Sequence, residues 1–212
     1  IAAVVPLMLL IMATLVMVQM QSFRNTLVVF AAAPLLLIGG GAALLPSGAP
    51  LGFVATTDAR GRVDVSPKGD PAGFVHVIDP TTIAIPERPG NKRVDGYLNV
   101  LERPHVGTLF VIPGRGDTLR INGRARILSD ADYFDAMAVQ GKRPILALEI
   151  AVEEVFFHCA KAFLRSDAWD PQRWDPEAVP SVAQMARAMR TDMSLEELER
   201  YFSEENMRSM LY

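Results

Sequence analysis

The sequence has little cysteine, little histidine and no excess of basic residues. Its single cysteine, Cys159, excludes a disulfide framework and a zinc site built from several thiolates. The three histidines, His76, His105 and His158, are too scattered in the chain to predict a metal site, so we expect none. With 21 basic against 24 acidic residues, the chain also lacks the basic surface of a nucleic-acid-binding protein.

Charge is almost absent from the first quarter of the chain. Residues 1–57 contain one charged side chain, Arg24, and all 24 acidic residues lie after them. The uncharged runs 1–21 and 26–45 each approach the roughly 20 residues that a bilayer-spanning helix needs. We therefore predict an α-helical, transmembrane-like hairpin within residues 1–50 and membrane contact through residues 1–45.

Two other readings of this leader remain open. A signal peptide would have a shorter apolar region, a basic start and a cleavage site, and a buried hairpin of a soluble protein would be free of charge over fewer residues. The strings that favour the membrane are P-L-M-L-L-I-M-A-T-L-V-M-V-Q-M-Q-S-F, A-P-L-L-L-I-G-G and G-A-P-L-G-F-V-A. Over about residues 4–55 they resemble two consecutive helices of resistance-nodulation-division efflux transporters. The rest of such a transporter is missing from the sequence, so the resemblance implies no transport.

After Leu51 the pattern changes to short β-prone runs separated by Gly, Pro and Asp. We predict strands at 52–57, 62–66, 74–78, 82–85, 106–112, 118–128 and 145–157. Many short strands with turns between them are typical of a β-barrel, closed or partly open. The expected fold class is therefore mainly β, a barrel with few helices.

Four helices are predicted around this barrel. The first spans 92–102, capped by Asn91, with Val94, Leu98 and Leu101 on its apolar face. The others span 130–140, 158–166 and a C-terminal segment from the capping box at 194–197 to about residue 210. We divide the chain into an apolar hairpin (1–50), a barrel domain (51–174) and a helical tail (175–212).

Polar residues gather at two loops that a barrel can bring together. Ser66 and Lys68 follow one predicted strand, and Asn91, Lys92 and Arg93 open the first predicted helix. A helix start with free amides and neighbouring cations is suited to binding an anion such as a phosphate. The alternative is an ordinary solvated basic turn with an Asn cap.

Three long motifs surround these residues. They are D-V-S-P-K-G-D-P-A-G-F-V, I-A-I-P-E-R-P-G-N-K-R-V-D and N-V-L-E-R-P-H-V-G-T-L-F-V-I-P-G-R-G-D-T-L-R-I-N-G-R-A-R-I. In this order they resemble the pyridoxamine 5'-phosphate oxidase-like flavoproteins, from about residue 53 to residue 212. The resemblance implies an FMN-binding split barrel in the cytoplasm, usually a homodimer with FMN at the subunit interface. The hairpin would make the chain membrane-associated if it inserts, and it replaces the helical lead-in that such proteins carry before the first strand.

The resemblance also assigns candidate cofactor contacts. Those implied for the FMN phosphate are Ser66, Lys68, Asn91, Lys92 and Arg93. Arg120 falls at a position that contacts the flavin ring, with Thr118 near it.

The motif V-F-F-H-C-A-K-A-F-L-R-S-D-A-W-D-P matches one bacterial subgroup of these flavoproteins. It supplies further candidates for contact with the ring or a substrate, which are His158, Lys161, Arg165 and Trp169. Ordinary structural roles for His158 and Lys161 fit the sequence equally well.

No catalytic residue can be named from the sequence. The expected function is FMN-dependent oxidation or reduction of a small molecule, in which the cofactor carries the redox step. The alternatives are a non-enzymatic flavin- or haem-binding protein, and a chimeric membrane-tethered fragment without activity.

Overall fold

The computed structural model describes residues 48–189 and 192–212. The predicted membrane hairpin therefore lies almost entirely outside the described residues. Within the described ranges, no helix has the length and apolar character required to cross a bilayer.

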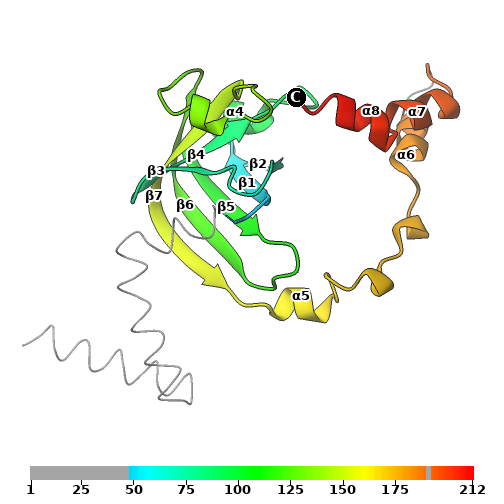
Figure 1. The fold of residues 1–212 in the computed structure, drawn as a ribbon, viewed down its shortest axis with the longest axis horizontal. Coiled ribbons are helices and arrows are strands. Elements are labelled where there is room, and N and C mark those ends of the chain that lie inside the picture. Colours follow the sequence, from blue (N-terminus) through cyan, green and yellow to red (C-terminus); the bar gives the residue numbers. More distant parts are fainter. Residues whose placement is uncertain (1–47, 190–191) are drawn as a thin grey trace, which may run out of the picture.

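Seven antiparallel strands form one curved sheet (Figure 1). They are β1 (Leu51–Thr57), β2 (Val63–Gly69), β3 (His76–Asp79), β4 (Thr82–Glu87), β5 (His105–Val111), β6 (Thr118–Leu128) and β7 (Leu146–His158). Their order in the sheet is β2-β1-β5-β6-β7-β4-β3, so β2 and β3 are its two edges. The predicted class, mainly β with few helices, is confirmed, and the sheet is consistent with a split barrel.

Alternation of side chains places the core on the inner face of this sheet. In β1 the even-numbered residues Gly52, Val54 and Thr56 are buried, whereas the residues between them are partly exposed. The inner face of β6 adds Leu119 and Ile121, which are almost fully buried. This two-residue period is the pattern expected when one face of an antiparallel sheet covers a core.

The two longest strands, β6 and β7, approach each other closely at Gly123. A Cβ atom at this position would lie 2.1 Å from the carbonyl oxygen of Ala151. The register between β6 and β7 shifts between Asn122 and Gly123, as in a β-bulge. Glycine is therefore required here by backbone contact, and the shift bends the sheet.

Strand β2 is longer than predicted. It continues through Pro67 and Lys68 to Gly69, beyond the predicted end at residue 66. Pro67 is tolerated because β2 is an edge strand. Lys68 therefore lies within the strand rather than after it, and that part of the prediction is wrong.

Helix α4 (Asp95–Glu102) begins later than predicted and packs through a different face. Gly96 and Val100, four residues apart, face the sheet, and a Cβ at Gly96 would lie 3.2 Å from a carboxylate oxygen of Asp64. Val94, Leu98 and Leu101, predicted as the apolar face, are 51%, 54% and 73% exposed. A larger residue at position 96 would therefore require the Asp64 side chain to move by a few tenths of an ångström.

The predicted helix at 130–140 is wrong. A single 3-10 turn, Asp135–Met137, stands there, and it buries Phe134 and Met137 against the sheet. Gln140 and Gly141 have positive φ angles, so the chain turns there instead of continuing a helix.

After β7 the chain forms a tail of short helices, drawn from yellow to red in Figure 1. They are α5 (Lys161–Arg165), α6 (Val182–Met189), α7 (Leu195–Tyr201) and α8 (Glu204–Ser209). The predicted helix at 158–166 is reduced to α5, since His158 ends β7.

The capping box of Ser194 and Glu197 at the start of α7 is confirmed. The predicted single C-terminal helix is interrupted, however, because Ser203 caps a separate helix, α8. Figure 1 shows the tail running away from the sheet and returning toward the end that carries α4.

Candidate functional site

The candidate site is a cavity of about 530 Å³ at the open edge of the barrel. β3 pairs with β4 only as far as Ala84, so Ile85–Glu87 have no strand partner on that side among the described residues. Residues 64–69 of β2, with Asp70 after it, lie across the opening from residues 86–88. We call this opening the seam, and the cavity lies within it.

Strand alternation directs one row of β2 side chains into the seam. Asp64, Ser66 and Lys68 are the half-buried members of β2, and each lines the cavity. The hydroxyl of Ser66 makes no hydrogen bond within the described part of the chain, so it is available to a ligand. Val54 of β1 and Leu148 of β7 supply part of the apolar floor.

Lys68 does not face the cavity as a free cation. Its ammonium Nζ lies 2.5 Å from Oε2 of Glu87, across the seam. The same oxygen accepts a 2.5 Å hydrogen bond from the hydroxyl of Tyr97 in α4. Burial, followed by this hydrogen bond to Glu87, raises the pKa of Tyr97, so the phenol stays protonated.

The loop before α4 carries the other predicted phosphate contacts. Asn91 does not cap the helix, because α4 begins at Asp95; its side-chain oxygen instead accepts a 3.0 Å hydrogen bond from the backbone N–H of Arg93. Lys92 sits between them at φ 61°, a left-handed conformation. Asn91 and Arg93 line the cavity, but Lys92 does not.

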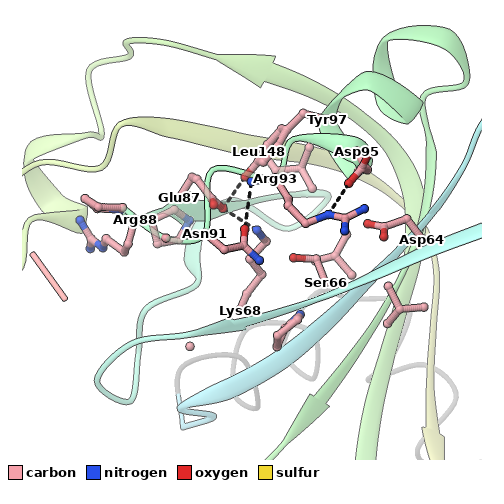
Figure 2. Close-up of a pocket in the computed structure, with 18 of the residues that line it drawn as sticks. Asp64, Ser66, Lys68, Glu87, Arg88, Asn91, Arg93, Asp95, Tyr97 and Leu148 are labelled. Carbon is pink, nitrogen blue, oxygen red and sulfur yellow. Dashed lines mark hydrogen bonds and ion pairs between the residues drawn. The ribbon is translucent and has the colours of Figure 1, made fainter. Parts of the chain in front are cut away.

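Arg93 is also paired with a carboxylate. Its Nε lies 2.8 Å from Oδ2 of Asp95, and this ion pair is largely exposed, at 74% and 49% for the two side chains. The hydrogen bond from Arg93 to Asp95 raises the pKa of the guanidinium, which therefore remains charged. Figure 2 shows Arg93 and Asp64 at one end of the cavity and Arg88 at the other, with Lys68 and Glu87 between them.

Every cation of the cavity lining has a carboxylate partner. The basic residues are Lys68, Arg88 and Arg93; the acidic ones are Asp64, Asp70, Glu87 and Asp95. An entering anion must therefore replace a carboxylate or share a cation with it. The exposed pair of Arg93 is the easiest to exchange, because solvent screens its attraction.

Thr118 and Arg120 do not join this group. Thr118 is buried where β6 begins, opposite His158 in the sheet register. Arg120 and His158 line a second hollow, of about 580 Å³, together with Phe53 and Ala55 of β1. Those two residues alternate with the inward-facing ones of β1, so this hollow lies on the outer face of the sheet.

The remaining candidates belong to the tail. Lys161 and Arg165 are exposed on α5 and line neither cavity. Trp169 stacks on Phe163, with ring centroids 5.4 Å apart, and its Nε1 donates a 2.6 Å hydrogen bond to the carbonyl oxygen of Arg115. The structure therefore shows packing for Trp169 and no cavity contact for these three residues.

Several cavity residues escaped the sequence analysis. Glu87 and Tyr97 act on Lys68, and Asp70 holds Arg88 at 2.6 Å. Glu87 and Arg88 stand immediately before Pro89 and Gly90 in one of the quoted motifs, which was a usable signal. Nothing local in the sequence indicates that residue 212 reaches the same cavity.

Among the comparisons with known proteins, a family model matches more than half of the chain. The family model described as pyridoxamine 5'-phosphate oxidase matches residues 42–159. A search of curated proteins finds no match.

Among solved structures, three similar proteins illustrate the range. A HupZ variant from Group A Streptococcus is 24% identical, with a TM-score of 0.45, and covers 57% of this chain and 99% of its own. An FMN-binding protein from Syntrophomonas wolfei is 16% identical, with a TM-score of 0.44, and covers 66% and 96%. General Stress Protein 26 from Bacillus anthracis is 13% identical, with a TM-score of 0.36, and covers 53% and 87%. These TM-scores are too low to support a functional conclusion.

Proposed function

The chain belongs to the pyridoxamine 5'-phosphate oxidase family, and from this premise we propose that it binds FMN with the phosphate in the seam. The observation that carries the proposal is the convergence of Ser66, Lys68, Asn91 and Arg93 on one cavity. These residues come from an edge strand and from a loop that begins more than 20 positions later. The cavity volume is within the usual 300–1,000 Å³ of small-molecule sites.

The chemistry of the cavity suits a phosphomonoester. Ser66 offers an unused hydroxyl, and Lys68 and Arg93 offer an ammonium and a guanidinium. A guanidinium can bind two phosphate oxygens at once, whereas an ammonium acts as a point charge. Arg93 would exchange Asp95 for the phosphate, and Lys68 would be shared between the phosphate and Glu87.

We propose an oxidoreductase function for the loaded protein, acting on a small molecule. FMN would supply the ring that accepts and donates electrons. The chain's own residues would bind the phosphate, close the seam around it and keep the phenol of Tyr97 protonated beside Glu87. Non-enzymatic flavin or haem binding is the alternative, and turnover with a reduced nicotinamide cofactor separates catalysis from binding alone.

A homodimer is part of the proposal. Arg120 lies on the outer face of the sheet, with the exposed side chain of Val65 bordering the same hollow. A second copy packed against this face would bring Arg120 beside a cofactor at the interface, which is the arrangement that the family resemblance implies. Size-exclusion chromatography with light scattering should give twice the mass of one chain for the wild type. Val65→Asp should reduce this mass to that of a single chain. A wild-type monomer that retains stoichiometric FMN would contradict this arrangement.

The family resemblance also favours a cytoplasmic location for the flavin domain. We retain the division into residues 1–50, 51–174 and 175–212 as part of the proposal. The membrane hairpin stays a prediction from the sequence.

The phosphate site is tested by FMN binding to single variants. Arg93→Ala should weaken FMN by about ten- to more than a hundredfold, because a charge-assisted hydrogen bond contributes roughly 1.5–3 kcal/mol. Arg60→Ala, in the turn between β1 and β2, is the matched control and should bind FMN as the wild type does. Riboflavin, which lacks the phosphate, should bind both proteins equally. If Arg93→Ala and Lys68→Ala both keep wild-type affinity for FMN, the assigned site is wrong.

A further inference from the structure

We propose that Leu211 and Tyr212, the last two residues of the sequence, form a wall of the seam cavity that retains the bound ligand. The inference rests on the proposed function, since the ligand concerned is FMN in the seam. Both residues line the cavity, although they follow Asp70 by more than 140 positions. They are the tail's contribution to the site.

Three contacts hold Tyr212 in place. Its hydroxyl donates a 2.6 Å hydrogen bond to Oδ1 of Asp70. Nζ of Lys142 donates a 2.7 Å hydrogen bond to the backbone oxygen of Tyr212. The guanidinium of Arg88 lies over the tyrosine ring, 5.8 Å from its centroid. Ring, hydroxyl and backbone are therefore each fixed by a different residue.

The residues that anchor Tyr212 are themselves buried and hydrogen-bonded. The other carboxylate oxygen of Asp70 binds Nε of Arg88 at 2.6 Å, and the two side chains are only 2% and 12% exposed. Arg88 also donates to the carbonyl oxygens of Met137, at 2.6 Å, and Lys142, at 3.3 Å. Tyr212 thus docks on a buried, fully bonded network, which positions its ring at little further entropic cost.

The wall stands at the end of the cavity where a ligand would extend. Arg88, which touches Tyr212, lies at the opposite end of the cavity from Arg93 (Figure 2). A flavin whose phosphate is bound by Ser66 and Arg93 would occupy the space between these ends. Removing the ring would open one end of the cavity, and the ligand would leave faster.

The kinetic test measures FMN release from the full chain after dilution into excess competitor. Tyr212→Ala should release FMN about tenfold faster than wild type, and Tyr212→Phe, which keeps the ring but loses the bond to Asp70, should fall between them. Tyr201→Ala is the matched control, because this tyrosine lies in α7 outside the cavity, and its rate should stay within about twofold of wild type. Wild-type release from Tyr212→Ala would overturn the proposal.

A second measurement needs no flavin. Trypsin cuts after Arg208, which lies in α8 and is exposed, and the anchored wall should protect this site. In the flavin-free protein, Tyr212→Ala and Asp70→Asn should increase cleavage after Arg208 severalfold, while cleavage after Arg173 should not change. Equal cleavage after Arg208 in Tyr212→Ala and wild type would refute the wall. A wild-type chain that binds no FMN would refute the proposed function instead, and the proteolysis would then decide the wall alone.

Discussion

The two ends of the seam cavity hold the same kind of ion pair in different surroundings. Arg88 and Asp70 are 12% and 2% exposed, whereas Arg93 and Asp95 are 74% and 49% exposed. The buried pair has further bonds to the backbone and to Tyr212, and the exposed pair joins two residues two positions apart. A cation that lines a cavity is therefore not always available to a ligand. Exposure to solvent determines how easily it can exchange its carboxylate partner for an anion.

The largest effect should come from breaking the buried pair. Asp70→Ala leaves the guanidinium of Arg88 buried without its carboxylate, which typically costs about 3–5 kcal/mol of unfolding free energy. Asp95→Ala, at the exposed pair, should cost less than about 1 kcal/mol. Urea unfolding of both variants measures the difference, and equal losses would show that burial does not separate the two pairs.

The pair of Lys68 and Glu87 lies between these extremes, at 12% and 23% exposure. Glu87→Gln removes the negative charge that competes with an entering anion, so affinity for inorganic phosphate should rise by about tenfold, or roughly 1.4 kcal/mol. Asp95→Asn should raise it by less, because the exposed pair is already screened. Isothermal titration with phosphate checks both variants, and a lower affinity in Glu87→Gln would mean that Glu87 positions Lys68 instead of competing for it.

Tyr97, which shares Glu87 with Lys68, should make the stability of the protein depend on pH in the alkaline range. Its pKa is raised by burial and by the bond to Glu87, so its contribution to stability is complete below the unfolded value of about 10. Above that pH the unfolded chain ionises first, and the contribution is lost as the pH rises toward the folded value. Tyr97→Phe should therefore reduce the loss of stability between about pH 9 and pH 11. Urea unfolding at both pH values gives the slope, and an unchanged slope would rule out the buried phenol as a source of it.

The smallest effect should come from the exposed loop. Lys92 has a left-handed backbone conformation, which costs a non-glycine residue roughly 1–2 kcal/mol. Glycine avoids this cost, but it loses about 0.5–1 kcal/mol more conformational entropy on folding. Lys92→Gly should thus stabilise the protein by about 0.5 kcal/mol. It should leave FMN affinity unchanged, because Lys92 does not line the cavity. A loss of FMN binding would instead support the phosphate contact that the family resemblance implies for this residue.

The strands could be predicted because alternation and turn residues are local signals. The long strands β6 and β7 match the prediction closely, and along much of β6 every second residue is buried. The errors at β2 and α4 have a different origin. Pro67 depends on β2 being an edge strand, and the close approach of Gly96 to Asp64 depends on how α4 packs on the sheet; both are properties of the assembled sheet.

The site could be predicted only in part. The sequence motifs indicated Ser66, Lys68, Asn91 and Arg93, and these four do line one cavity. Glu87, the carboxylate partner of Lys68, was missed because the two residues are 19 positions apart in the sequence. No periodic pattern records a contact across an open edge.

The seam has a consequence for how a ligand can enter and leave the barrel. Its two sides, at Lys68 and at Glu87, belong to β2 and β4, whose backbones are not paired with each other among the described residues. The two sides are joined by side chains, so they can separate through rotamer changes while every described strand pair stays intact. Such an opening costs on the order of the ion pairs that it breaks, far less than global unfolding. A cofactor could therefore enter and leave a barrel that never unfolds.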